Sequence, residues 1–336
     1  MKKMIRFGKS ILTAVLTASM TVALAGCGGA SGSTGSSVTA SAGQTAATTE
    51  AGGSGEEKLV LRVGMECAYP PFNWTQDAAT TPDGSTAVPI YDSTLYAYGY
   101  DVAVAQMIAD QLGMDLEIHK VEWSSIGISM DAGDYDCIIA GMGRTAEREM
   151  AYSFTTPYYY RDNCIVVKAD GAYKDVTGLS QLAGTGCKVT TQLGTGWIPL
   201  LDQIDGAVTG SNYETTSECF MAVSNGVADI CIVDLPTAQS ALLTNKDLKI
   251  ITFDENDSFS GDEEMVNVCI ATRKSDTALR DKIQGAMDAL RWNDKAKMDA
   301  LMAKVIDQQP AANSAPAEAE LMIDIAIFGK EDYFIA

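Results

Sequence analysis

The sequence is poor in histidine: His119 is the one histidine among 336 residues. A Ser–His–Asp or Cys–His catalytic arrangement uses a histidine as its base, so this residue would have to serve. His119 lies on a stretch of alternating polar and apolar residues, which is typical of a strand. The sequence therefore argues against a histidine-activated nucleophile.

Paired cysteines of the CxxC type are also missing, although the chain has 8 cysteines. Cys137, Cys231 and Cys269 lie in apolar, strand-like runs, where a free cysteine behaves as a small hydrophobe. We therefore predict neither a disulfide framework nor a metal site. The glycine-containing run "QLGTG" lacks the GK[ST] ending of a phosphate loop, so no cofactor is predicted either.

Basic residues are few: 24 Lys and Arg stand against 44 Asp and Glu, giving a net charge of −20. A strongly acidic protein is a poor partner for nucleic acid or for an anionic membrane face. Its 46% hydrophobic content is ordinary for a soluble globular protein. A small anion held in a local basic pocket is still compatible with this composition.

The N-terminus has the features of a secretory signal peptide in residues 1–26. A basic start, "MKKMIRFGKS", precedes an apolar stretch that is too short for a membrane span. The stretch ends in "LAGC", which resembles the bacterial lipoprotein signal. That resemblance implies cleavage before Cys27, lipidation of Cys27 and anchoring on the outer, extracytoplasmic face of the cell membrane. The alternative is an ordinary cleavage site beside an unmodified cysteine.

Residues 27–56 are mainly Gly, Ser, Thr and Ala without apolar periodicity. Such a segment cannot bury a core and is predicted to be a flexible linker, with an rms reach of roughly 30 Å.

From residue 57 onward, strand-like and helix-like segments alternate, which predicts α/β lobes with helices flanking a sheet. Strands are expected at 58–65, 115–123 and 137–142, and a helix at 99–113 with Asp101 as its N-cap. A second series follows, with strands at 163–170, 187–194, 228–234 and 248–253 and helices at 216–226 and 235–244.

Two such series predict two lobes. Lobe 1 is expected to comprise residues 57–161 plus 269–306, and lobe 2 residues 162–268. Residues 307–336 form a C-terminal extension for which no structure is predicted. The chain would then cross between the lobes near residues 161 and 268.

Chemically distinctive residues fall at the carboxyl ends of the expected strands, where open α/β sheets bind ligands. They are Glu66, Tyr69, Arg148, Thr195 and Asp234. Arg148 lies at a helix start within "GMGRTAERE", a good place to grip a carboxylate. Asp234, with Glu66 opposite, would hold an ammonium. This pattern favours a free α-amino acid as the ligand.

Each of these residues also has a structural explanation. Arg148 could form a surface ion pair, and Asp234 could cap the helix that follows it. Glu66 and Asp234 could instead form a catalytic carboxylate pair.

Five segments in order complete the picture: "LRVGMECAYPPFNW", "YGYDVAVAQMIADQLG", "DYDCIIAGMGRTAEREMAYSFTTPYYY", "CKVTTQLGTG" and "NGVADICIVDLPTA". Together they resemble the extracellular solute-binding proteins of polar amino acid ABC transporters. The resemblance covers about residues 57–306. It implies the two-lobed type II periplasmic-binding fold, in which each lobe is a mixed, mostly parallel sheet flanked by helices.

The resemblance also implies roles for matching residues. Arg148 would clamp the ligand carboxylate with help from the N–H groups of Gly143 and Thr195. The Gly141 carbonyl and Asp234 would take the α-ammonium.

Three further positions would surround the ligand side chain. Tyr69 would stack on it, Trp123 would line the wall of the first lobe, and Glu66 stands where relatives that bind basic amino acids place an acid.

The sequence departs from the family pattern at several points. Glycine replaces the usual hydroxyl residue at 143, Arg144 replaces a small residue or proline, and Gly196 and Trp197 follow Thr195. Residues 75–98 form a longer insertion, which could be a flap or hairpin near the cleft mouth.

These features predict a monomeric, non-enzymatic receptor that closes on one amino acid and delivers it to the transmembrane subunits of an ABC permease. Glu66 favours a polar or basic ligand, whereas Trp197 could favour a larger apolar one. The alternative is an enzyme of the same fold resembling cyclohexadienyl or arogenate dehydratases, with Glu66 as the general acid.

Overall fold

The computed structural model describes residues 58–261 and 267–310. They belong to one compact unit that begins at Glu56. The predicted signal peptide, Cys27, the linker and most of the C-terminal extension lie outside the described residues. Within the described part of the chain, no helix is long and apolar enough to span a membrane.

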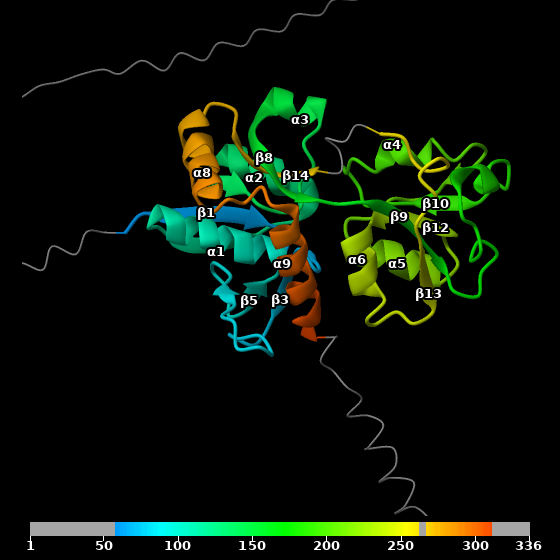
Figure 1. The fold of residues 1–336 in the computed structure, drawn as a ribbon, viewed down its shortest axis with the longest axis horizontal. Coiled ribbons are helices and arrows are strands. Elements are labelled where there is room, and N and C mark those ends of the chain that lie inside the picture. Colours follow the sequence, from blue (N-terminus) through cyan, green and yellow to red (C-terminus); the bar gives the residue numbers. More distant parts are fainter. Residues whose placement is uncertain (1–57, 262–266, 311–336) are drawn as a thin grey trace, which may run out of the picture. The chain divides into compact units, whose positions relative to one another are not determined.

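The first sheet has five strands in the order β6-β1-β7-β14-β8, and Figure 1 labels β1, β14 and β8 among them. Strand β1 pairs in parallel with β6 and β7, whereas β14 is antiparallel to both of its neighbours, β7 and β8. Four strands therefore run in one direction and β14 in the other. Their bounds are β6 (Asp115–Lys120), β1 (Val60–Met65), β7 (Cys137–Ile138), β14 (Asn267–Arg273) and β8 (Tyr152–Tyr160).

Helices pack on this sheet to form the first lobe. Helix α1 (Tyr100–Leu112) contacts α8 (Thr277–Ala289) and β6, and α8 packs against β8 and β14. Helix α2 (Ile126–Ala132) follows the 3₁₀ turn η1 (Trp123–Ser125) and packs against β1, β7 and β14. The last helix, α9 (Lys295–Asp307), contacts α1 and β8 and also reaches α6 of the second lobe.

The predicted N-cap of α1 was wrong. The helix is capped by Gly99, and Asp101 lies inside its first turn with a fully buried side chain. Gly99 has a φ of 136°, and a Cβ there would lie 2.3 Å from the carbonyl oxygen of Phe72. Only glycine fits this position, so the helix starts before Asp101. Asp101 instead accepts hydrogen bonds from Asn73 and Tyr158.

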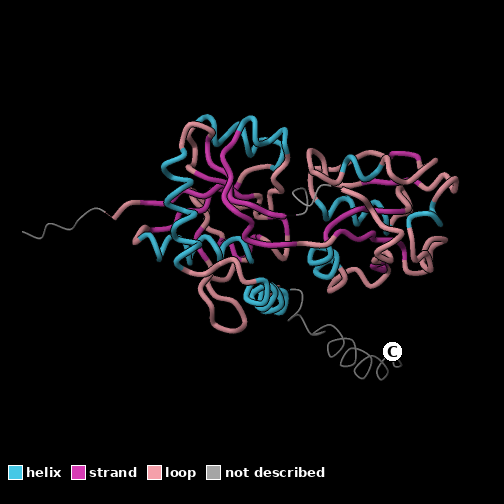
Figure 2. Tube along the Cα trace, turned by 45° about the horizontal axis from the view of Figure 1, so that its top comes forward, coloured by secondary structure: helices cyan, strands magenta, loops and turns pink. Residues whose placement is uncertain are grey.

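The second sheet repeats this design, with five strands in the order β11-β10-β12-β9-β13. Strand β10 is parallel to β11 and β12, whereas β9 is antiparallel to β12 and β13. Figure 2 shows these strands among the helices and loops of this lobe. Their bounds are β11 (Val208–Thr209), β10 (Lys188–Thr190), β12 (Ile230–Asp234), β9 (Asn163–Lys168) and β13 (Leu248–Ile251).

Two helices cover this sheet: α5 (Thr216–Ser224) and α6 (Leu235–Ala241) both contact β9 and β12. Two shorter elements, η2 (Leu179–Leu182) and α4 (Ile198–Leu201), complete the lobe. Since four of the five strands in each sheet share one direction, the predicted mixed, mostly parallel α/β fold is confirmed.

Strand β8 was not predicted, and its sequence, "YSFTTPYYY", contains Pro157. Proline lacks an N–H and is confined to edge strands or bulges. In the structure β8 is an edge strand, and the pairing of Pro157 with Cys269 falls at a register shift in the ladder. The proline is therefore tolerated where a central position would reject it.

Two connections join the lobes. The chain leaves the first sheet after Tyr160 and enters the second at Asn163, through Arg161 and Asp162. It returns between β13 and β14, a connection that contains the undescribed residues 262–266.

The insertion, residues 75–98, supplies β4 (Val88–Pro89), β5 (Tyr96–Tyr98) and the end of β3 (Asn73–Gln76) to a small sheet, and its β4 and β5 pair as antiparallel strands. Strands β2 (Ala68–Tyr69), β3, β5 and β4 pair in antiparallel fashion in that order. Asp83 ties this sheet to α9 through an ion pair of 3.0 Å with Lys304. None of residues 75–98 lines the pocket described below.

Candidate functional site

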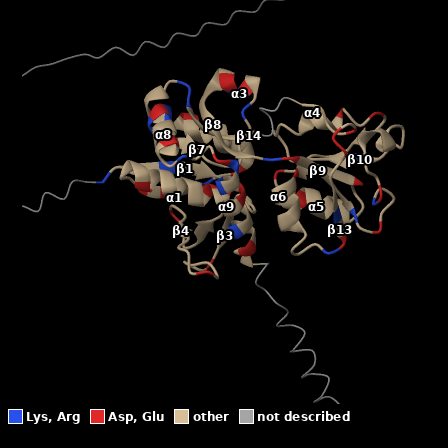
Figure 3. Ribbon diagram, viewed as in Figure 1, with Lys and Arg blue, Asp and Glu red and all other residues tan. Residues whose placement is uncertain are grey.

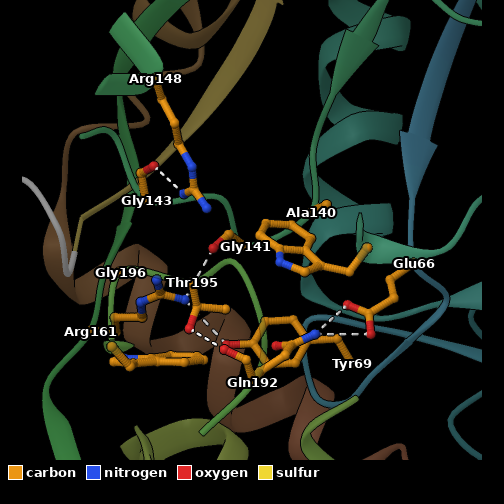
Figure 4. A pocket seen from close by; sticks show the side chains of 12 residues that line it. Glu66, Tyr69, Ala140, Gly141, Gly143, Arg148, Arg161, Gln192, Thr195 and Gly196 are labelled. Atoms are coloured by element: carbon orange, nitrogen blue, oxygen red, sulfur yellow. Dashed lines mark hydrogen bonds between the residues drawn. The ribbon is translucent and has the colours of Figure 1, made fainter. Parts of the chain in front are cut away.

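One pocket gathers most of the residues singled out from the sequence. It is a small pocket that is partly open to solvent, and residues of both lobes line it. Seven predicted residues line it, and the eighth, Asp234, contacts the lining residue Tyr69 (Figure 4). The seven are Glu66, Tyr69, Trp123, Gly141, Gly143, Arg148 and Thr195.

Arg148 enters the pocket from the short helix α3 (Ala146–Ala151), which is capped by Thr145. Its Nη1 donates to the Gly143 carbonyl at 2.7 Å, and its Nη2 donates to the Gly194 carbonyl of the second lobe at 2.8 Å. The guanidinium also lies 5.4 Å from the centre of the Trp123 ring. Among the described residues its polar partners are carbonyls and no carboxylate pairs with it, so it is not a surface ion pair.

The electrostatics around Arg148 favour an incoming anion. Burial, followed by the nearby charge of Arg161, lowers the pKa of Arg148 to about 10. The backbone N–H groups of Gly143 and Thr195 donate no hydrogen bond to any residue within 58–261 and 267–310. A ligand carboxylate would relieve the unbalanced charge and use these two donors.

Asp234 lies at the end of β12 and caps α6, accepting a hydrogen bond of 2.9 Å from the Thr237 N–H. The structural alternative considered for this residue is thus realised. Its side chain is fully buried, and Oδ2 accepts hydrogen bonds from the hydroxyls of Tyr69 and Thr237. Asp234 therefore does not line the pocket itself, and it is linked to the pocket through the hydroxyl of the lining residue Tyr69.

Gly141 forms the floor of the pocket against the Tyr69 ring. It has a φ of 61°, and a Cβ there would lie 2.6 Å from Cε1 of Tyr69. Its N–H donates to the Tyr158 hydroxyl at 2.9 Å, and that hydroxyl donates to Asp101. A left-handed backbone and this close approach both require glycine.

Arg161 is the residue that sequence reasoning missed. It lies on the connection between β8 and β9, and its side chain is only 5% exposed. Its Nη1 donates to the Gly141 carbonyl at 3.0 Å and to the Tyr69 hydroxyl at 3.2 Å, and lies 4.0 Å from Oδ2 of Asp234. The two groups expected to receive a ligand ammonium, Gly141 and Asp234, therefore both face Arg161.

Two departures from the family pattern, Trp197 and Arg144, differ in whether they line the pocket. Trp197 lines the pocket next to Arg161, and the Arg161 guanidinium lies 4.9 Å from the centre of the Trp197 ring. The Nε1 of Trp197 donates to the side-chain oxygen of Asn163. Arg144 is not a lining residue and pairs with Glu149 at 2.6 Å. Trp197 is thus placed to affect ligand choice, whereas Arg144 is not.

Glu66 follows β1 and is only 4% exposed. Gln192, another lining residue that was not predicted, donates to its two carboxylate oxygens at 3.2 and 3.3 Å. Burial raises the pKa of Glu66 to about 8, although the bond from Gln192 opposes the rise. Glu66 therefore presents a mainly neutral carboxyl at neutral pH.

We expect Glu66→Gln to remove a pH dependence of folding. The folded state keeps the Glu66 proton up to about pH 8, whereas the ordinary pKa of a glutamate is 4.5, so wild-type stability falls as pH rises between these values. From pH 5 to 8 the wild type should lose roughly 3 kcal/mol more unfolding free energy than the variant. Urea unfolding at several pH values measures this.

The matched control is Glu255→Gln, which removes an exposed acid. Its stability should follow the wild-type pH curve. Parallel curves for wild type and Glu66→Gln would contradict the raised pKa.

The positive charge of the two pocket arginines, Arg148 and Arg161, contrasts with the acidic character of the whole protein. Figure 3 shows acidic residues on α1, α3, α5, α8 and α9, in keeping with the net charge of −20. A positive pocket in an acidic protein selects for a small anionic group without attracting polyanions.

Comparison with known proteins identifies clear relatives. A family model for bacterial extracellular solute-binding proteins, family 3, matches residues 61–307. The ABC transporter arginine-binding protein 1 of Escherichia coli (strain K12) is 25% identical over 258 residues, covering 76% of this chain and 92% of that protein. The L-cystine-binding protein TcyJ of the same strain is 26% identical over 234 residues, covering 69% and 77%.

Solved structures agree with these matches. An ancestral arginine-binding protein bound to glutamine aligns with a TM-score of 0.57 at 26% identity, covering 75% of this chain and 98% of that chain.

Proposed function

Because the chain belongs to the bacterial extracellular solute-binding proteins of family 3, we propose that it binds a free amino acid in this pocket and delivers it to an ABC permease. The family match confirms the resemblance seen in the sequence. The observation that carries the ligand class is Arg148, a guanidinium held by carbonyls and Trp123, beside two unused backbone N–H groups.

The proposed contacts follow from this geometry. Arg148 and the N–H groups of Gly143 and Thr195 bind the α-carboxylate. The Gly141 carbonyl has two lone pairs and Arg161 uses one, so the other accepts from the α-ammonium. Asp234 supports the ammonium through its charge.

The ligand side chain would meet the remaining lining residues. Tyr69 and Trp123 provide aromatic surfaces and Glu66 a polar one. The two connections between the lobes act as the hinge, and closure is driven by contacts that both lobes make to the ligand.

A thermal-shift screen of the twenty amino acids tests this function, followed by calorimetry on the hits. A ligand that binds only the folded state raises the melting temperature. At least one amino acid should do so and should bind with one-to-one stoichiometry, as expected for a monomer. No shift with any amino acid would overturn the proposal.

We propose that the protein has no enzymatic turnover. The dehydratase alternative is less well supported, since the matching family and the two relatives described above are binding proteins. An assay with prephenate and arogenate should give no product, and catalytic turnover would favour the enzyme.

We also propose that Cys27 carries the lipid anchor. In a bacterial host with lipoprotein processing, the wild type should fractionate with membranes and incorporate an alkyne-labelled fatty acid. Cys27→Ala should lose the label and the membrane association, because the acyl chains supply the attachment. Cys67→Ala, which removes a buried thiol of the folded part, is the control and should keep both. Label on Cys27→Ala would contradict the anchor.

A further inference from the structure

Arg161 contributes a guanidinium to the pocket with only one of its terminal nitrogens in use. Nη1 makes the bonds to Gly141 and Tyr69. Nε is buried without a hydrogen-bond partner, and Nη2 makes no hydrogen bond to any residue within 58–261 and 267–310. Among the described residues, nothing therefore fills the edge that joins Nε and Nη2.

That edge has a specific chemistry. The two N–H groups on one side of a guanidinium are parallel and match the two oxygens of a carboxylate. An unsatisfied buried donor is costly, and buried polar groups in folded proteins almost always have partners. Trp197 lies 4.9 Å from the Arg161 guanidinium and supports it from one face. The unfilled edge indicates a partner that arrives with the ligand.

Four other charged or titratable groups surround this edge of Arg161. Arg148 and Arg161 are close enough for the charge of Arg161 to lower the pKa of Arg148. Two buried carboxylates lie near Arg161: Asp234, which also serves Tyr69 and the α6 cap, and Asp101, whose pKa the charge of Arg161 lowers. Glu66 is mainly neutral at neutral pH. The sign of the partner follows instead from the donors of the empty edge, because a guanidinium offers N–H groups and no acceptor.

We propose that Arg161 is a ligand-binding residue whose Nε–Nη2 edge binds the second carboxylate of a dicarboxylic amino acid, while Arg148 binds the α-carboxylate. This rests on the proposed function and narrows it, among polar amino acids, to an acidic side chain. Figure 4 shows the two guanidinium groups near one another around the Gly141 carbonyl, as this arrangement requires.

Arg161 also has a structural role, since it joins the first lobe, through Gly141 and Tyr69, to the start of β9. That role is fulfilled by Nη1 alone. It explains neither the empty edge nor the placement of a second cation beside Arg148. The two roles predict different ligand selectivity, which makes them separable.

Calorimetry on the mature chain with two acid–amide pairs tests the proposal: L-glutamate against L-glutamine, and L-aspartate against L-asparagine. The wild type should bind one acid at least about tenfold more tightly than its amide and than L-arginine. Arg161→Gln should weaken binding of that acid by about 30-fold or more, with less than about threefold change for the amide.

Two further variants keep the test decisive. Arg161→Lys retains the positive charge over Trp197 but lacks the planar edge, so it should fold and still lose most of the acid preference. Arg291→Gln removes an exposed arginine and should leave all affinities unchanged.

Three results would overturn the proposal. They are equal or tighter wild-type binding of an amide or of L-arginine, an equal loss of acid and amide binding in Arg161→Gln, and an undiminished acid preference in Arg161→Lys. The proposed function would fail differently, because the wild type would then bind no amino acid of any class.

Discussion

Arg148→Ala should abolish amino acid binding, weakening the affinity by at least about 100-fold. In the complex, the Arg148 guanidinium and the ligand α-carboxylate would both be shielded from solvent. Removing Arg148 would therefore leave the ligand carboxylate buried and unpaired. Removing one member of such a pair costs on the order of 3–5 kcal/mol. Isothermal calorimetry with the best ligand from the thermal-shift screen measures the loss.

The control for this change is Arg291→Ala, which removes an arginine exposed to solvent. It should bind as the wild type does. Arg148→Lys should recover part of the affinity, because an ammonium keeps the charge but cannot form the two-pronged contact. Unchanged affinity in Arg148→Ala would sink the assignment of the pocket.

The second large effect is expected on folding. Asp234→Ala should lower the free energy of unfolding by about 3–5 kcal/mol, because it leaves the Arg161 charge without its buried counter-ion. It also removes the cap of α6 and the acceptor of the Tyr69 hydroxyl. Urea unfolding of the ligand-free protein measures the change, and ligand binding should be lost as well.

A matched control separates the cap from the charge. Asp294→Ala removes another aspartate N-cap, that of α9, in an exposed setting, and should cost only about 1 kcal/mol. Asp234→Asn keeps the cap and the shape but not the charge, and should fall between the two. Equal losses for Asp234→Ala and Asp294→Ala would show that Asp234 is only a cap.

Much of the fold could be predicted because its signals are local. The apolar runs at 58–65, 163–170 and 228–234 are long enough to identify β1, β9 and β12, and the glycines that follow helices mark their ends. The errors came from residues whose conformation depends on distant contacts. Asp101 looks like a cap until Phe72 crowds Gly99, and Pro157 looks like a breaker until β8 is known to be an edge strand.

The same distinction applies to the site. Residues at strand ends could be brought together on paper, because parallel strands share an edge, and four of the five line one pocket. Arg161 escaped notice because it lies on a connection between sheets, where spacing along the sequence says nothing about direction. Gln192 follows the short strand β10, and only its partner Glu66 in the other lobe reveals its role.

The peptide group at Gly141 has a consequence for how such a receptor could evolve. Its N–H is held by Tyr158 and its carbonyl by Arg161, while the Tyr69 ring blocks any side chain at that position. The backbone at the floor of the pocket is therefore fixed, and ligand specificity cannot evolve by changes in the backbone at Gly141. A new ligand specificity would have to arise by substitution of Arg161, Gln192 or Trp197. A single substitution there changes the charge or volume of a lining side chain and leaves the backbone of the pocket unchanged.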